Sequence, residues 1–334
     1  MPQVVISTQF NPYLNIAVEN YLLSLPPDGG VTLYLWQNQR TVVIGQNQNP
    51  YAECDVEHLE MDGGYLMRRR TGGGAVFHDL GNINFSFIVP NDLYDTARQF
   101  AVLQRAVASY GLDTQISGRN DVLVFSRGPQ GEGGCGRKFS GNAFSKGRHQ
   151  RLHHGTILIR TDMEVLQRYL KVKPAKLQRH GVASVSSRVV NLSELNQDIT
   201  AENIKPLMVK AFEEEYGRPL QVLDFDTLAH LPQVQELYSM FASPEWKYGN
   251  WQRFEAQRSA QFEWGGIDLS LVVDEASYTI SSVAIASDCL FPDVIAQAQH
   301  LLTGASTLHP PDTSSFPTHD QQMLKDIFSL LYPE

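Results

Sequence analysis

The spacing of hydrophobic residues predicts a mixed protein in which helices and strands alternate over the first 240 or so positions. Helical spacing is found at residues 15–25, 97–110, 162–170 and 200–216. Runs rich in β-branched and aromatic residues predict strands at 31–36, 41–44, 65–70, 75–78, 83–89, 121–125 and 155–160. The first two strands are separated by a short polar segment, so we expect them to form a hairpin. Strand 83–89 alternates in a way that predicts one mostly apolar face.

The pattern changes after about residue 250. Two β-rich runs, 261–264 and 267–273, flank Gly265-Gly266 and predict a hairpin. Another strand and two helices follow, at 278–284, 292–302 and 321–331. The fold class predicted is therefore α+β, with a mixed β-sheet domain flanked by helices at residues 1–245 and a small α+β domain at 250–334. We place the boundary near 240–255.

Composition narrows the function classes. The chain has 334 residues, of which 42% are hydrophobic and 19% charged, as expected for a folded protein with a sizeable core. A formal net charge of −9 disfavours a general nucleic-acid-binding protein, which would need a basic face. No run of 18 apolar residues predicts a membrane span, and the first residues do not resemble a signal peptide. Three scattered cysteines predict neither disulfides nor a zinc site, which favours a reduced, cytoplasmic location.

The strongest chemical signal is the sequence RRRTGGGAVFHD at residues 68–79. Glycine permits close approach of the backbone, and successive amides without side chains can surround an anion. Arginine adds a planar, permanently charged donor that suits phosphate and carboxylate. We therefore expect a small anion to bind here, although three glycines can equally form an ordinary tight turn.

Several common motifs are absent from the sequence. Residues 131–138 are rich in glycine before a lysine, but Arg137 and Phe139 break the pattern of a P-loop. No GxGxxG opens a helix after a strand, which disfavours a dinucleotide-binding fold. Cys54 and His58 lack a second pair of ligands, so a metal site there is disfavoured.

Three further polar segments contain glycine and could complete an anion site, namely 117–121, 136–142 and 152–156. Asn120 and Asp121 could hold a ribose, an adenine edge or Mg²⁺. Lys138 could neutralise charge that develops on a carboxylate or an α-phosphate. Taken singly, each segment also has an ordinary explanation as turn or surface chemistry.

In order and spacing, these segments resemble the bacterial two-domain lipoate–protein ligases. The resemblance covers nearly the whole chain and rests on residues 68–82, GRND at 118–121, RKFSG at 137–141, HHGT at 153–156, SVSSRVVNL at 184–192, WKYG at 246–249 and FEWGG at 262–266. It implies a fold shared with biotin–protein ligases and a reaction in two steps. Lipoate and Mg-ATP give lipoyl-AMP and pyrophosphate, and a lysine of a lipoyl domain then attacks the adenylate and releases AMP.

The resemblance also implies roles for individual residues. Lys138 would contact the lipoyl carbonyl and the α-phosphate, and Asp121 would bind Mg²⁺ and orient the lysine. Arg70 would bind phosphate or the lipoate carboxylate. The other residues expected at the lipoate and ATP site are Gly73, Gly74, Ala75, Val76, Phe77, His78, Asn120, Gly141, His154, Gly155 and Thr156. The implied partners are lipoyl-domain proteins, that is, dehydrogenase E2 subunits or the glycine-cleavage H protein, and the enzyme would be a monomer.

Two alternatives remain at this point. An octanoyl or lipoyl transferase would carry the acyl group on a cysteine, for which Cys135 is the candidate nearest the motifs. A non-catalytic lipoate-binding protein is disfavoured by the presence of Arg70, Asp121 and Lys138 together. The loop 126–136 is longer and richer in glycine than the resemblance implies, and we expect it to become ordered when lipoyl-AMP binds.

Overall fold

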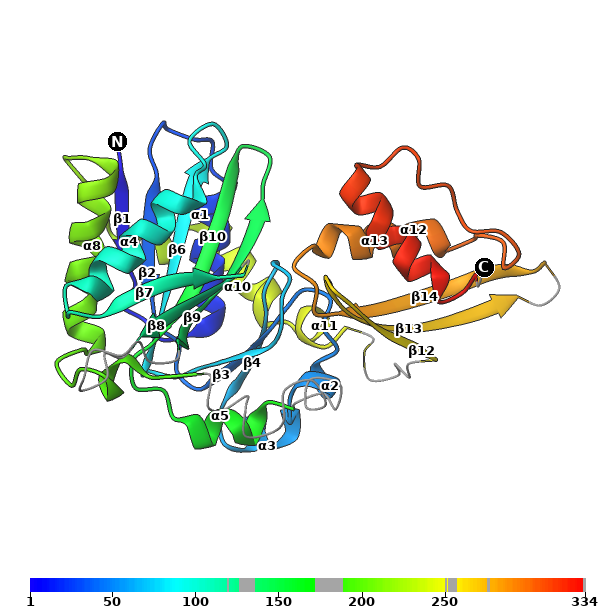
Figure 1. Cartoon of the computed structure of the whole chain (residues 1–334), viewed down its shortest axis with the longest axis horizontal. Coiled ribbons are helices and arrows are strands. Elements are labelled where there is room, and N and C mark those ends of the chain that lie inside the picture. The colour runs from blue at the N-terminus through cyan, green and yellow to red at the C-terminus, as the bar shows by residue number, and fades with distance from the viewer. Residues whose placement is uncertain are drawn as a thin grey trace.

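The larger part of the molecule is built on an eight-stranded mixed sheet (Figure 1). The computed structural model describes residues 1–118, 120–125, 136–171, 189–249, 251, 257–274 and 277–332. In spatial order the strands are β11 (Gln221–Leu223), β1 (Gln3–Ile6), β2 (Thr32–Trp36), β6 (Asn82–Pro90), β10 (Gln150–Leu158), β9 (Arg137–Lys146), β8 (Asp121–Phe125) and β7 (Asp113–Ser117). The predicted α+β class is confirmed. The loop 126–135 with Cys135, and the segment 172–188, lie outside the described residues.

Helices cover both faces of this sheet. Side chains alternate between the faces along each strand, so Leu33 and Leu35 pack in one core and Tyr34 and Trp36 in the other. The first core includes α4 (Thr96–Ala108) and α8 (Ala201–Tyr216), and the second includes α1 (Pro12–Ser24), α9 (Phe225–Ala229) and α10 (Pro232–Ala242). The predicted caps are confirmed, since Thr200 begins α8 and Asp162 begins α5 (Met163–Tyr169).

A second, three-stranded sheet carries the glycine-rich sequence. Its order is β4 (Tyr65–Arg68), β3 (Thr41–Ile44) and β5 (Val76–His78). The predicted hairpin of 31–36 with 41–44 is therefore wrong, because β2 and β3 belong to different sheets. In the polar segment between them Gln37 and Asn38 are buried, whereas Gln39 and Arg40 are exposed. Asn15 donates to the Gln37 carbonyl at 2.8 Å and to Asn38 Oδ1 at 3.1 Å. The short helices α2 (Pro50–Glu53) and α3 (Val56–Met61) and the 3-10 helix η1 (Leu192–Glu194) complete this part of the chain.

Strand β6 differs from its prediction in a way that matters for the site. Every residue from Asn82 to Pro90 is buried, because helices cover both faces of the sheet at this central strand. The polar side chains of Asn84 and Ser86, which alternate with the predicted apolar face, also lie inside the protein. A polar side chain in such a place requires a hydrogen-bonding partner, and Ser86 has one in Glu19.

The C-terminal part has its own three-stranded sheet and its own hydrophobic core. The predicted hairpin is present as β12 (Arg258–Phe262) and β13 (Gly265–Asp274), but Phe262 pairs with Gly265, so the turn lies at Glu263-Trp264 and not at the predicted Gly265-Gly266. Strand β14 (Thr279–Ser287) and helices α12 (Pro292–Leu302) and α13 (Thr318–Ser329) follow, close to the predicted bounds. In Figure 1 this part lies to one side of the larger sheet, with α11 (Pro244–Lys247) between them.

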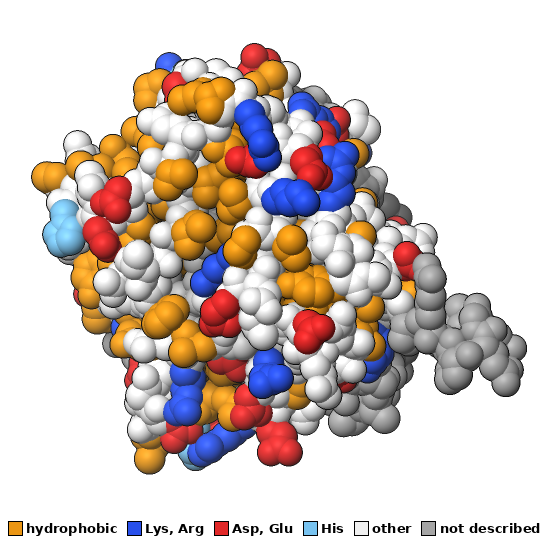
Figure 2. Space-filling model, turned by 90° about the vertical axis from the view of Figure 1, so that its left-hand side faces the viewer, with side chains coloured by type: hydrophobic (Ala, Val, Ile, Leu, Met, Phe, Trp, Pro, Cys, Tyr) orange, Lys and Arg blue, Asp and Glu red, His pale blue; other side chains and the backbone are white. Residues whose placement is uncertain are grey.

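The C-terminal part meets the larger part at the glycine sequence. The Gly73 amide donates to the Cys289 carbonyl at 2.8 Å, and the Ser287 amide donates to the Asn47 carbonyl at 2.9 Å. A Cβ on Gly72 would overlap the Cys289 carbonyl oxygen, so glycine is required for this approach. The side of the molecule seen at the left of Figure 1 shows hydrophobic side chains mixed with charges of both signs (Figure 2).

Candidate active site

The predicted pair of Asp121 and Lys138 is brought together by two antiparallel strands. Asp121 is paired with Gly141 and Lys138 with Leu123, two residues further along β8, so the side chains of Asp121 and Lys138 are diagonal neighbours across the β8–β9 pair. Lys138 Nζ lies 2.6 Å from Asp121 Oδ1, and each side chain is 35% exposed. Among the described residues no donor is aligned for a hydrogen bond with Asp121 Oδ1. The contact between Lys138 Nζ and Asp121 Oδ1 is therefore an ion pair. A partly exposed ammonium held by one carboxylate can therefore reach an anionic ligand.

Gly141 leaves the space that the Lys138 side chain occupies. A Cβ at this position would lie 3.1 Å from Lys138 Nζ and 3.2 Å from its Cε. The Gly141 amide donates to Thr156 Oγ1 at 3.3 Å, which ties β9 to β10 beside the lysine. The sequence predicted Gly141 and Thr156 as site residues, and the structure places both next to Lys138.

Asn120 and Gly155 are connected to the surroundings of Lys138 through Asn142. The Asn120 carbonyl accepts from the Asn142 amide at 2.8 Å and from Asn142 Nδ2 at 3.1 Å. A Cβ on Gly155 would overlap Asn142 Oδ1, so the bare backbone of Gly155 makes room for that side chain. Both predicted residues thus lie around Asn142, next to the turn that precedes Asp121.

The three arginines before the glycines have different surroundings. Arg68 and Arg69 are buried, and their guanidinium groups donate to backbone carbonyls, including Gly45, Gln48, Gly72 and Gly74. These contacts hold the loop in shape. Burial lowers the pKa of Arg69 to about 10, so the group remains charged at neutral pH.

Arg70, the predicted anion-binding arginine, is the exposed member of the three. Its guanidinium lies over the rings of Phe241 and Trp246, at 5.6 and 5.7 Å from their centroids. Nη2 lies 3.5 Å from Met240 Sδ. Weakly hydrated guanidinium groups stack on aromatic rings in this way and keep donors available at the edge of the plane.

The glycine amides are not all available to a ligand. Gly73, with φ of +93°, donates its amide to Cys289 in the C-terminal part. The Gly74 carbonyl accepts from Arg69 at 2.9 Å. Phe77 packs in a core against Tyr169, while Val76 packs in the core that contains Tyr34 and Trp36. The expectation of three unobstructed amides therefore needs correction, since in this conformation the C-terminal part occupies the middle one.

His78 is a buried, neutral histidine with one nitrogen free. Asn38 Oδ1 accepts from Asn15, so Asn38 presents its Nδ2 to His78 Nδ1 at 3.2 Å. Nδ1 is thus an acceptor and Nε2 carries the proton. Burial, helped by the Arg69 charge, lowers the pKa of His78 to about 3. Within the described part of the chain His78 Nε2 has no hydrogen-bond partner, and a buried unpaired donor is costly unless a ligand accepts from it.

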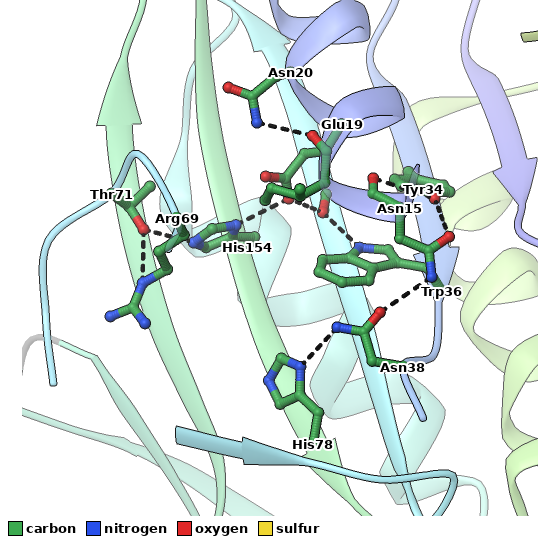
Figure 3. Close-up of polar contacts among 12 residues, drawn as sticks. Asn15, Glu19, Asn20, Tyr34, Trp36, Asn38, Arg69, Thr71, His78 and His154 are labelled. Atoms are coloured by element: carbon green, nitrogen blue, oxygen red, sulfur yellow. Dashed lines mark hydrogen bonds and ion pairs between the residues drawn. The ribbon is translucent and has the colours of Figure 1, made fainter. Parts of the chain in front are cut away.

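His154 lies in a continuous chain of buried hydrogen bonds (Figure 3). Arg69 Nε donates to Thr71 Oγ1 at 3.0 Å, and Thr71 Oγ1 lies 2.9 Å from His154 Nε2. His154 Nδ1 lies 2.9 Å from Glu19 Oε1. The directions are consistent when Thr71 donates to Nε2 and Nδ1 donates to the carboxylate.

Hydrogen bonds from Trp36 and Ser86 also lead to the Glu19 carboxylate. Trp36 Nε1 donates to Ser86 Oγ at 3.0 Å, and Ser86 Oγ donates to Glu19 Oε1 at 2.5 Å. Glu19 is 1% exposed, so these donors replace the water that a carboxylate would otherwise bind. Glu19, Trp36, Thr71 and Ser86 were not predicted from the sequence. The signal was present in Glu19, the one charged residue of helix α1, where it lies among mostly buried positions.

A pocket of about 270 Å³ opens beside this network. Its lining includes Glu19, Arg70, Thr71 and Leu152, together with Ser145 and residues 147–149 where β9 turns into β10. Its wall therefore contains both the predicted anion-binding arginine and the end of the buried polar chain.

A tightly held metal is not indicated by the described residues. They contain no group of three His, Cys, Asp or Glu side chains that could hold an ion. Mg²⁺ in nucleotide sites is instead commonly bound by one or two carboxylates together with substrate phosphates. Asp121, as a partly exposed carboxylate, fits that second kind of site.

Comparisons with known proteins give one consistent result. Residues 11–213 match the model of the lipoyl protein ligase A/B catalytic domain, and residues 252–309 match the bacterial lipoate protein ligase C-terminus. A lipoate-protein ligase A of Psychrobacter cryohalolentis is 40% identical over 88% of this chain and 85% of its own length. The crystal structure of P. falciparum LipL1 in complex with lipoate covers 100% of both chains with a TM-score of 0.82 and 28% identity.

A bipartite lipoate protein ligase from Thermoplasma acidophilum, solved in a study of an archaeal lipoylation system with its E2 lipoyl domain, is also similar. It covers 76% of this chain and 98% of its own, with a TM-score of 0.61 and 27% identity.

Proposed function

This chain belongs to the lipoate–protein ligase family, and we propose that Lys138 and Asp121 form the centre at which it activates lipoate. The family makes it an ATP-dependent ligase. In the first step a lipoate carboxylate oxygen attacks the α-phosphorus of ATP, the bond to the β-phosphate breaks, and lipoyl-AMP and pyrophosphate form. In the second step the amine of an acceptor lysine attacks the lipoyl carbonyl carbon, loses a proton and releases AMP.

The observation that carries this assignment is the partly exposed ion pair of Lys138 and Asp121. The reaction brings two anions together, so a fixed cation at the meeting point lowers the repulsion between them and stabilises the charge that develops. Asp121 fixes the ammonium before substrate arrives, and this preorganisation avoids a rearrangement during the reaction. The chemistry needs no covalent intermediate on the protein.

The buried polar side chains support a nearby substrate site. The unpaired Nε2–H of His78 is a donor that a polar atom of lipoate or ATP would satisfy. Arg70, on the pocket wall, is the candidate for binding phosphate or the lipoate carboxylate. We further propose that the segment Gly73–Phe77, with Asn120, His154, Gly155 and Thr156, surrounds the nucleotide and the acyl group. The Gly73 amide could contact substrate only after its bond to Cys289 is broken.

Mg²⁺ is part of the proposal. Asp121, which has no neighbouring set of described metal-ligating side chains, would hold the ion together with the phosphates of ATP. The ion would neutralise phosphate charge. The protein's own contribution is to place Lys138, with Asp121 oriented at its side.

A transferase that works through a cysteine is not favoured by the described cysteines. Cys54 and Cys289 are buried, and burial raises the pKa of Cys54 to about 12 and also raises the pKa of Cys289. The thiolate, which is the nucleophile, is therefore scarce at both. Cys135 lies outside the described residues.

The acceptors proposed are lipoyl-domain proteins, either E2 subunits or the glycine-cleavage H protein, modified by a monomeric enzyme in the cytoplasm. The Thermoplasma protein described with an E2 lipoyl domain supports the first of these.

No helix among the described residues is long and apolar enough to cross a membrane. A division into domains 1–245 and 250–334 is also proposed, and the separate C-terminal core supports it.

Lipoate-dependent exchange of labelled pyrophosphate into ATP tests adenylation directly. We expect exchange with lipoate, Mg²⁺ and ATP, and a mass increase of one lipoyl group on an added lipoyl domain. Octanoate in place of lipoate measures chain preference. Acyl transfer from a thioester donor without ATP, and no exchange, would favour the transferase instead.

A further inference from the structure

His153 lies on β10 beside His154 and is connected to the proposed centre through Asn142. It is fully buried among four phenylalanine rings, the nearest being Phe144 and Phe100 with centroids at 4.6 and 4.8 Å. A histidine in an aromatic core is usually a packing residue. Its two nitrogens are nevertheless both in hydrogen-bonding contact, with Asn142 Oδ1 at 2.9 Å and with Gln99 Oε1 at 2.8 Å.

The hydrogen bond to Asn142 has a defined direction. Asn142 Nδ2 donates to the Asn120 carbonyl, so its Oδ1 must face the histidine and accept from Nε2–H. Burial lowers the pKa of His153 to about 3, so the ring is neutral and Nδ1 is an acceptor. Gln99 Nε2 has no partner elsewhere among the described residues. When the side-chain amide of Gln99 is turned so that its NH₂ faces His153 Nδ1, Gln99 Nε2 and His153 Nδ1 are hydrogen-bonded to each other.

The chain of contacts ends at the residue before Asp121. Asn142 donates twice to the Asn120 carbonyl, once from its backbone and once from its side chain. That carbonyl belongs to the peptide that leads into Asp121, whose side chain holds Lys138. The absence of a side chain at Gly155 leaves the space for Asn142.

We propose that His153 and Asn142 form a positioning pair that fixes the Asn120–Asp121 peptide, and through it the Asp121–Lys138 ion pair. His153 orients the Asn142 amide, and the amide fixes the carbonyl of Asn120. Neither residue contacts the reacting atoms. This inference rests on the proposed function of Asp121 and Lys138.

Asn142→Asp and His153→Phe test the pair. Asp keeps the shape and can accept from His153, but it cannot donate to Asn120. Phe keeps the ring in its aromatic cage and removes the donor. We expect each change to lower kcat of pyrophosphate exchange about 10–100-fold, since small displacements of reacting groups cost this much. KM for lipoate should stay within about 3-fold, because Arg70 and the lining of the pocket are untouched. The kcat of the double variant should be no lower than that of the less active single variant. Both substitutions disrupt the same fixing of the Asn120 carbonyl, so their effects should not add.

Two further variants separate positioning from packing. Phe100→Leu loosens the same cage without touching Asn142 and should lower Tm with little change in kcat. His153→Gln retains an N–H donor and should recover most of the activity lost in His153→Phe. Wild-type kcat in Asn142→Asp, or kcat losses that follow Tm across all variants, would overturn the proposal. Lys138→Ala with full exchange would instead show that the centre itself is misassigned.

Discussion

The Lys138 side chain lies across the bare α-carbon of Gly141, with Nζ 3.1 Å from the place a Cβ would occupy. This distance is tighter than an ordinary contact, so any side chain at position 141 must displace the lysine. The glycine is thus part of the arrangement that holds Lys138 against Asp121.

Gly141→Ala should consequently reduce activity more than stability. The added methyl group would move Lys138 by a few tenths of an ångström, and we expect kcat of pyrophosphate exchange to fall about 10-fold. The backbone at Gly141 is not in the left-handed region, so Tm should change little. Gln115→Ala, at an exposed position of β7 in the same sheet, is the control. A loss of Tm as large as the loss of kcat would contradict this explanation.

Acid should destabilise the protein through His78 and His153. Burial lowers the pKa of each to about 3, against about 6.5 in the unfolded chain. The unfolded state therefore binds more protons, so stability is full above pH 6.5 and falls as pH drops toward 3. Each histidine contributes a slope of about 1.4 kcal/mol per pH unit within that window.

Urea unfolding between pH 7 and 5 measures this slope. His153→Phe should make it shallower by about one proton, while substitution of the exposed His309 by Gln should not alter it. Equal slopes for wild type and His153→Phe would show that burial of His153 has no effect on proton binding.

Glu19→Ala should be strongly destabilising. Its carboxylate accepts from His154 and Ser86 inside the protein, and the Arg69 charge lies near it. Removing one partner of a buried charged network typically costs about 3–5 kcal/mol. Glu19→Gln should cost less, because its carbonyl can still accept. Urea denaturation gives both values, with Glu57→Gln as the exposed control. A loss below about 1 kcal/mol in Glu19→Ala would contradict a network role.

Gly72→Ala should separate the C-terminal part from the glycine sequence. A methyl group there would overlap the Cys289 carbonyl oxygen and strain the Gly73 hydrogen bond. We expect a larger radius of gyration in small-angle scattering, while the fold of the larger sheet is retained. Asn47→Ala, which removes only the bond to the Pro292 carbonyl at 3.1 Å, should have a smaller effect. An unchanged radius in Gly72→Ala would mean that this contact does not hold the two parts together.

The sequence predicted most elements, because local patterns determine them. Helix α8 begins at the predicted cap, and β12 and β13 form the predicted hairpin. Local pattern does not say which sheet a strand joins, and for this reason β2 and β3 were wrongly paired. The buried face of β6 was missed for the same reason, since burial of Ser86 depends on a helix 67 residues earlier in the chain.

The sequence predicted which residues belong to the site. The distances between them follow only from the fold. Lys138 and Asp121 were selected by motif order, and the β8–β9 register brings them to 2.6 Å. Arg69 and Arg70 look equivalent in sequence, yet one is buried in the loop and the other stacks on Trp246. The contact of Gly73 with Cys289 spans more than 200 positions, so no local signal could have shown it.

Lipoate-dependent ATP–pyrophosphate exchange by Lys138→Ala is the most direct test of the central assignment. Lys146→Ala is its matched control, because Lys146 is an exposed lysine on the same strand. We predict that Lys138→Ala lowers kcat about 10²–10³-fold, as expected for loss of one preorganised charge, with Tm near that of wild type, while Lys146→Ala exchanges normally. Exchange by Lys138→Ala at the wild-type rate would contradict the assignment.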